Sequence, residues 1–142
     1  TNMQRASYLA GMAFTRAYVG NIHAIAHTLG GFYNVPHGLA NAVIMPYVLE
    51  FYGEVAQKPL AELADLVGIA PGKSEKERAQ AFIDWIKEMN RLMDIPTKIK
   101  GIQTNDIPAM AKRAIAEANP LYPVPKIMTL KEMAFMYMQI KE

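Results

Sequence analysis

The chain has 142 residues, a small formal net charge of +2 and no cysteine. The absence of cysteine excludes disulfides, a thiolate metal site and a cysteine nucleophile, and it fits a cytoplasmic location. Because the basic residues are interleaved with acids and the apolar stretches break off before the roughly 18 residues of a membrane span, we expect neither nucleic acid nor a membrane as a partner.

The N-terminal third of the chain predicts three helices. The first is interrupted at Gly20–Asn21, and the second follows over residues 22–29. Glycine readily takes the left-handed conformation of a C-cap, so we expect the second helix to end at Gly30–Gly31. The third helix is expected to open near His37. This third of the chain is expected to lie against other protein, because it contains only three charged residues: Arg5, Arg16 and Glu50.

The middle of the chain predicts two more helices. In the first, apolar residues recur at helical spacing before Gly68, namely Leu60, Leu63, Ala64 and Val67. The second opens with a capping box, since the Ser74 hydroxyl and the Glu77 carboxylate can satisfy free backbone amides. Its core stripe is expected to consist of Phe82, Trp85, Ile86, Met89 and Leu92.

Two further helices complete the prediction. One has Pro108 in its first turn and an apolar face made of Ile107, Met110, Ala111 and Ala114. A proline-rich connection over residues 119–125 leads to the last helix. That helix opens with a second capping box, Thr129 and Glu132, and its core stripe is Met133, Met136, Tyr137 and Ile140. We therefore predict an all-α fold of about seven helices, with residues 1–142 as one domain.

The three histidines of the chain, His23, His27 and His37, fall within one almost charge-free stretch. His23 and His27 are four residues apart, so their rings share one face of a helix. A turn at Gly30–Gly31 can reverse the chain and return His37 to that face. At the start of a helix the His37 ring is kept neutral, because the positive end of the helix dipole disfavours imidazolium. This clustering predicts metal binding or acid–base chemistry.

Two kinds of metal site are compatible with the spacing. In one, all three rings bind a single zinc and leave a fourth position for water, as in a hydrolytic or hydrating enzyme. In the other, only two rings are ligands and the remaining ligands come from elsewhere. A third interpretation needs no metal: the chain would be a helical interaction module whose histidines are hydrogen-bonded core residues.

Residues 10–51 closely resemble the signature region of the iron-containing (group III) alcohol dehydrogenases. The resemblance includes both histidine spacings and the sequence N-x-P-H-G at positions 34–38. It continues more loosely to Asn119–Pro120 and the Thr-capped last helix, although Leu121 stands where the family often places a basic residue. Such enzymes combine an N-terminal dinucleotide-binding α/β domain with a C-terminal helical domain of the dehydroquinate synthase-like fold. This chain resembles the second domain only.

The resemblance implies roles for four residues. His23 and His37 would bind the catalytic metal, Fe2+ or Zn2+. His27 would stand near the nicotinamide of NAD or NADP and the reacting carbon without binding metal, as a catalytic and cofactor-contacting residue. Phe14 matches an aromatic position by the substrate and is counted with His27 among the cofactor-binding residues. The family completes its metal site with an Asp and a His four residues apart on an earlier helix, and no such pair precedes His23 here.

The implied function is that of the C-terminal, metal-contributing domain of an NAD(P)-dependent alcohol dehydrogenase or aldehyde reductase, inactive alone. Its expected partners are a small alcohol or aldehyde, the N-terminal nucleotide-binding domain absent from this chain, and further copies in a homo-oligomer. The second candidate is a metal-dependent lyase or hydrolase, either dehydroquinate synthase-like or built on a three-histidine zinc site, because a shared architecture does not specify the chemistry. A requirement for nicotinamide would separate the two.

Overall fold

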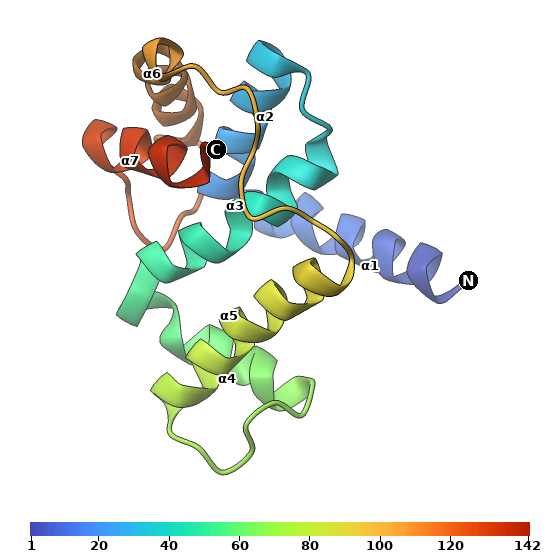
Figure 1. Cartoon of the computed structure of the whole chain (residues 1–142). Coiled ribbons are helices and arrows are strands. Elements are labelled where there is room, and N and C mark those ends of the chain that lie inside the picture. Colours follow the sequence, from blue (N-terminus) through green and yellow to red (C-terminus); the bar gives the residue numbers. More distant parts are fainter.

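A computed structural model describes all 142 residues of the chain, which form helices joined by loops (Figure 1). The all-α prediction is confirmed, and the only extended pairing is an isolated bridge between Ile99 and Lys141. None of the helices combines the length and the apolar character that crossing a bilayer requires. The seven α-helices and two short 3-10 helices are α1 (Asn2–Ala17), α2 (Asn21–Tyr33), α3 (His37–Tyr52), η1 (Gly53–Ala56), α4 (Gln57–Leu66), α5 (Glu75–Leu92), η2 (Thr104–Asp106), α6 (Ile107–Ala118) and α7 (Leu130–Ile140).

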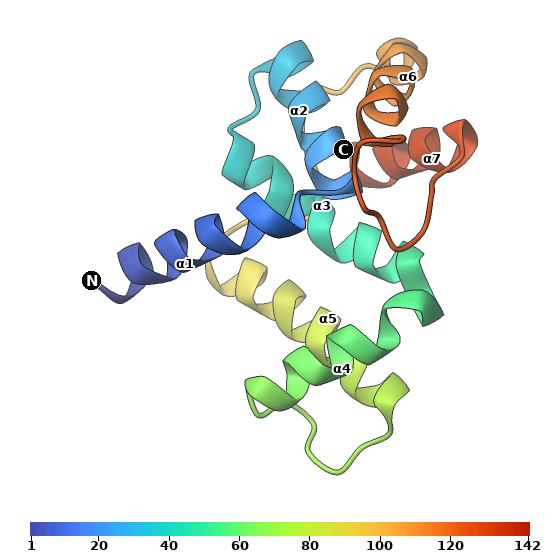
Figure 2. The ribbon, with the colours of Figure 1, turned by 180° about the vertical axis from the view of Figure 1, so that it is seen from behind.

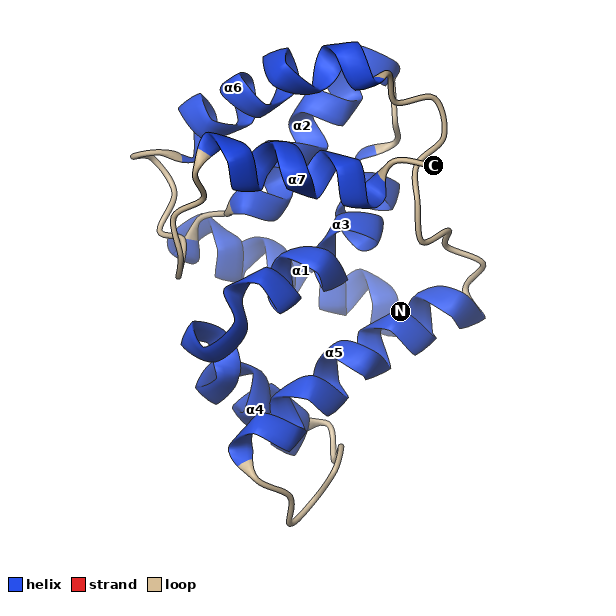
Figure 3. Cartoon of the chain, turned by 60° about the vertical axis from the view of Figure 1, so that its left-hand side comes forward, coloured by secondary structure: helices blue, strands red, loops and turns tan.

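The helices form a central group, an outer pair and a projecting arm. In the central group α2 packs against α3 and α6, and α7 packs against α6 and α3. The outer pair consists of α4 and α5, which pack against each other and lie at the end of the molecule opposite α6 (Figure 3). The arm is α1, whose N-terminal part extends away from the other helices (Figures 1 and 2). No residue of α1 is buried.

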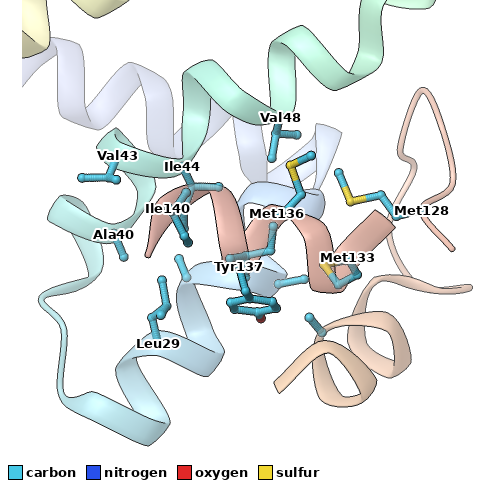
Figure 4. Close-up of a cluster of buried hydrophobic side chains, with 14 of the residues drawn as sticks. Leu29, Ala40, Val43, Ile44, Val48, Met128, Met133, Met136, Tyr137 and Ile140 are labelled. Atoms are coloured by element: carbon cyan, nitrogen blue, oxygen red, sulfur yellow. The ribbon is translucent and has the colours of Figure 1, made fainter. Parts of the chain in front are cut away.

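The main core lies where the central helices meet. Figure 4 shows side chains of α3 and α7 in one cluster with Leu29 of α2, and Leu29, Ile44 and Tyr137 are fully buried there. The predicted apolar faces of the last two helices are confirmed, because all of their members are buried: Ile107, Met110, Ala111, Ala114, Met133, Met136, Tyr137 and Ile140. Helix α6 packs against α2, the helix that carries His23 and His27, and α7 packs against α6 and α3.

The predicted end of α2 was wrong. The helix continues through Gly30 and Gly31 to Tyr33, and Asn34 takes the left-handed conformation with a φ of 56°. The backbone N–H of Asn34 donates to the carbonyl of Gly30, so asparagine supplies the C-cap that was expected of glycine. Phe32 and Tyr33 pack against the core, which stabilises the last turn despite the low helix propensity of two glycines.

The predicted core stripes of α4 and α5 were partly wrong. Four of their members are exposed: Leu63, Val67, Trp85 and Leu92. On α5 the buried residues are instead Ala79 and Ile83. Helix α5 packs mainly against α3 and α4, so only a narrow face of it is covered. A core stripe at helical spacing predicts a wider buried face.

Both predicted capping boxes are confirmed. The Ser74 and Thr129 hydroxyls accept hydrogen bonds from the backbone N–H groups of Glu77 and Glu132, and each glutamate accepts a bond from the backbone N–H of its capping residue in return. By contrast, Thr1 precedes α1 without any side-chain cap. The start of α7 is therefore held by two local bonds that the start of α1 does not have.

Candidate functional site

The three histidine rings lie together where α2 and α3 meet. His23 and His27 occupy successive turns of α2, and His37 is the first residue of α3. The ring centroid of His37 is 5.2 Å from that of His23 and 5.2 Å from that of His27, and the centroids of His23 and His27 are 5.8 Å apart. The structure thus brings together all three histidines that the sequence analysis singled out.

The short turn between α2 and α3 accounts for this convergence. Asn34 ends α2 in the left-handed conformation, and Pro36 precedes α3 with an extended ψ of 130°. Together they reverse the chain within three residues, and the two helices then pack against each other. His37 consequently starts its helix beside the face of α2 that carries His23 and His27.

Asn41 orients the His37 ring. It lies one turn further along α3, and its side-chain amide nitrogen is 3.0 Å from Nε2 of His37 and 3.0 Å from the His37 carbonyl oxygen. An amide NH2 group only donates, so Nε2 of His37 accepts, and its lone pair is directed at Asn41. The Oδ1 atom of Asn41 is buried and has no hydrogen-bond partner. Sequence reasoning missed Asn41, although its i+4 spacing from His37 was a local signal.

The electrostatic environment favours a neutral His23 ring. Burial lowers the pKa of His23 below its usual value of 6.5, and the neighbouring rings of His37 and His27 lower it further, while Glu117 acts in the opposite direction. Only a neutral imidazole has a nitrogen lone pair available for a metal. His23, the most buried of the three rings, therefore favours the neutral form, which is the form that binds metal.

A carboxylate from a distant part of the chain reaches the third ring. Oε1 of Glu117, near the end of α6, is 2.6 Å from Nδ1 of His27 and also accepts a hydrogen bond of 2.7 Å from the Tyr122 hydroxyl. Sequence analysis did not identify Glu117 or Tyr122 as site residues. Ninety positions separate His27 from Glu117, so no local pattern could have found the contact.

The separation of His23 and His37 fits two ligands of one metal ion. Two imidazoles bonded to a tetrahedral metal at about 2.1 Å have ring centroids about 5 Å apart. The observed distance between these two centroids is 5.2 Å. No group of three or more histidine, aspartate or glutamate side chains is arranged to hold a metal by itself. The centroids of His27 and His37 are also 5.2 Å apart, but these two rings are stacked with an interplanar angle of 16°, so their in-plane lone pairs do not meet at one metal, and Nδ1 of His27 contacts Glu117. The geometry therefore suits His23 and His37 as a partial site better than a three-histidine site.

Phe14 lies away from the protein interior. It belongs to α1, and 54% of its surface is exposed. No aromatic contact joins its ring to any of the three histidines, whose ring contacts are with one another. Its predicted place by the substrate stays a prediction.

Comparison with known protein families gives a match over nearly the whole chain. The C-terminal part of the Fe-containing alcohol dehydrogenase family matches residues 1–140. Alcohol dehydrogenase 4 of Saccharomyces cerevisiae is 41% identical over 122 residues, which cover 83% of this chain and 31% of the yeast protein. Lactaldehyde reductase of Escherichia coli K12 is 34% identical over 116 residues, which cover 80% of this chain and 30% of that enzyme.

Solved structures agree with this match. The crystal structure of a 1,3-propanediol oxidoreductase superposes with a TM-score of 0.86 at 35% sequence identity, over 95% of this chain and 36% of the other. An alcohol dehydrogenase from Oenococcus oeni superposes with a TM-score of 0.83 at 32% identity. The chain spans about a third of the length of the relatives that it matches.

Proposed function

Because this chain belongs to the iron-containing alcohol dehydrogenase family and corresponds to its C-terminal part, we propose that it contributes half of the metal site of an NAD(P)-dependent alcohol dehydrogenase or aldehyde reductase. In this proposal residues 1–142 form one helical domain, with His23 and His37 as the two ligands that it offers to Fe2+ or Zn2+. The other ligands and most of the nucleotide site belong to protein outside this chain, so the chain alone is inactive.

The observation that carries the proposal is the pairing of His23 with His37. Their ring centroids are 5.2 Å apart, and they come from two helices packed against each other. Nε2 of His37 carries no proton, and a metal would displace Asn41 from its lone pair. Imidazole accepts either iron or zinc, so the ring geometry is compatible with both metals. Two rings already held at this separation need little rearrangement when a metal binds, apart from release of the Asn41 hydrogen bond to His37.

The residues around the pair have distinct roles in the proposed reaction. When bound, a divalent metal acts as a Lewis acid towards the substrate oxygen, and a nicotinamide cofactor exchanges hydride with the substrate carbon. His23 and His37 hold one side of the site. His27, whose ring is 5.2 Å from that of His37, contacts the nicotinamide and the reacting end of the substrate. Phe14 supplies an apolar wall once the rest of the protein covers α1.

The substrate class and the partners follow from the relatives and from α1. The similar proteins include a lactaldehyde reductase and a 1,3-propanediol dehydrogenase, which supports a small alcohol or aldehyde as substrate. Several large apolar side chains of α1 are exposed: Met3, Tyr8, Leu9, Met12 and Phe14. An apolar face of this kind is normally covered by other protein. The N-terminal nucleotide-binding domain and further copies of the protein in a homo-oligomer are the proposed partners.

Metal analysis of a longer protein that includes the nucleotide-binding domain tests this proposal. We expect His23→Ala and His37→Ala to remove bound metal and activity, whereas His27→Ala retains metal and slows turnover. Equal metal loss in all three variants would favour the three-histidine zinc site of a lyase or hydrolase instead. Alcohol oxidation by the 142-residue chain alone, at ordinary enzymatic rates with NAD or NADP, would contradict the proposed division of the site.

A further inference from the structure

Glu117 connects the histidine cluster to a segment that the proposed reaction does not use. A single oxygen, Oε1, contacts Nδ1 of His27 at 2.6 Å and accepts the Tyr122 hydroxyl at 2.7 Å. Glu117 lies in the last turn of α6, and Tyr122 lies in the connection that follows this helix. The His27 ring is thus anchored to α6 through one of its two nitrogens.

This contact determines where the proton of a neutral His27 ring resides. A carboxylate oxygen only accepts, so Nδ1 of His27 is the donor and carries the proton. In the neutral ring Nε2 then keeps a lone pair. Tyr122 donates to the same carboxylate, and burial together with Glu117 raises the pKa of Tyr122 to about 12, so the hydroxyl keeps its proton near neutral pH.

The contact is poorly explained as a device that stabilises the fold. The side chains of His27 and Glu117 are 43% and 29% exposed, and even a fully charged pair at this exposure would contribute little to stability. The packing of α2 and α6 already buries apolar residues on both helices, among them Ala24 and Ala114. The contact instead restricts the orientation of the His27 ring, whose centroid lies within 5.8 Å of the centroids of the two other histidine rings.

We propose that Glu117, held in turn by Tyr122, is a positioning residue that fixes the tautomer and the direction of the His27 ring and so reserves Nε2 for the reacting end of the substrate. The proposal rests on the proposed function, in which His27 lies beside the substrate and the nicotinamide. Glu117 itself contacts neither of them. A carboxylate behind a histidine is a common way of fixing which ring nitrogen bears the proton.

Nitrogen NMR of the histidine rings in the 142-residue chain tests the tautomer directly. We expect one-bond and long-range 1H–15N correlations to show His27 with its proton on Nδ1. Glu117→Gln keeps an acceptor and should preserve this tautomer, whereas Glu117→Leu removes the acceptor and should shift the proton to Nε2. Glu62→Leu, at an exposed glutamate of α4, is the matched control and should leave the His27 signals unchanged. A wild-type ring protonated on Nε2, or a Glu117→Leu ring that stays protonated on Nδ1, would overturn the proposal.

Kinetics of the longer protein supply the second readout. Loss of the group that orients a metal-binding histidine typically costs about 10-fold to 100-fold in metal affinity or activity, and we expect a similar factor for the group that orients His27. We expect kcat to fall by that factor in Glu117→Leu, with KM and metal content retained, and to recover largely in Glu117→Gln. Loss of metal in Glu117→Leu would contradict the positioning role, because Glu117 would then support a metal ligand. The NMR result is independent of metal and activity, so a longer protein that binds no metal would contradict only the proposed function.

Discussion

Helices α1 and α2 start from similar sequences and end in opposite environments. Both are rich in apolar residues and poor in charge; α1 contains only Arg5 and Arg16, and α2 contains no aspartate, glutamate, lysine or arginine. Six residues of α2 are buried, whereas none of α1 is. Leu29 of α2 has no exposed surface, while 52% of Leu9 in α1 is exposed.

The difference shows that an apolar composition predicts that a helix is covered by other protein, but does not predict which part of the protein covers it. α2 is covered by α3 and α6 of the same chain, and this packing also places the histidines. α1 has no comparable packing within the chain. In the proposed function its apolar face belongs to the interface with the rest of the dehydrogenase, and Phe14 reaches the site only after that interface forms.

Amide hydrogen exchange should give the largest contrast between the two helices. Opening of core helices costs up to the global free energy of unfolding, which is about 5–15 kcal/mol for typical domains, whereas exposed segments open at almost no cost. We expect amides of α2 to exchange near the global limit and amides of α1 to exchange almost freely in the 142-residue chain, because an isolated helix of this length is marginal in water. Equal protection of both helices would mean that α1 packs against the chain in solution.

Leucine truncation tests the same contrast by substitution. Leu29→Ala should lower the free energy of unfolding by about 2–5 kcal/mol, because it leaves a cavity in a closely packed core. Leu9→Ala on α1 is the matched control and should change it by no more than about 0.5 kcal/mol. Urea unfolding followed by circular dichroism measures both. A large loss in Leu9→Ala would show that α1 packs against the rest of the chain in solution.

Two threonines extend the comparison to polar groups. Thr28 of α2 bonds the hydroxyl of Tyr137, which is fully buried, whereas Thr15 of α1 bonds only the carbonyl of Gly11 on its own helix. Thr28→Val should cost about 1–3 kcal/mol, because it leaves a buried hydroxyl without a partner. Thr15→Val should be nearly neutral. Since Tyr137→Phe removes the orphaned hydroxyl, the double variant with Thr28→Val should be more stable than Thr28→Val alone, and unfolding of all four proteins completes the cycle.

The smallest expected effect concerns the helix starts. Hydrogen bonds from the Thr129 backbone and side chain hold the pKa of Glu132 below its usual value of 4.5, whereas α1 has no such cap. A depressed pKa in the folded state means that the stabilisation is present above the unfolded pKa and is lost as pH falls through the folded pKa. The free energy of unfolding should therefore decline below about pH 4.5 in the wild type and decline less steeply in Glu132→Gln.

Urea unfolding at several acidic pH values measures this decline. Glu62→Gln is the control, because Glu62 is exposed on α4 and caps no helix. An unchanged pH dependence in Glu132→Gln would show that the capping box makes no titratable contribution to stability.

The candidate site could be predicted in part from local patterns. The i, i+4 spacing placed His23 and His27 on one helix face, and the short connection allowed His37 to join them. The residue predicted to end α2 was wrong, because Asn34 rather than a glycine forms its C-cap. Glu117 was not predicted, since its contact with His27 depends on how α6 docks against α2.

Short-range information in the chain was sufficient for the seven helices, both capping boxes and the clustering of the histidines, because helical periodicity and capping act over three or four residues. Packing between distant helices decided which apolar faces are buried, left α1 and Trp85 exposed, and brought Glu117 to His27. These outcomes depend on the relative placement of whole helices. A contact between residues ninety positions apart, such as that of His27 with Glu117, produces no periodic pattern in the sequence.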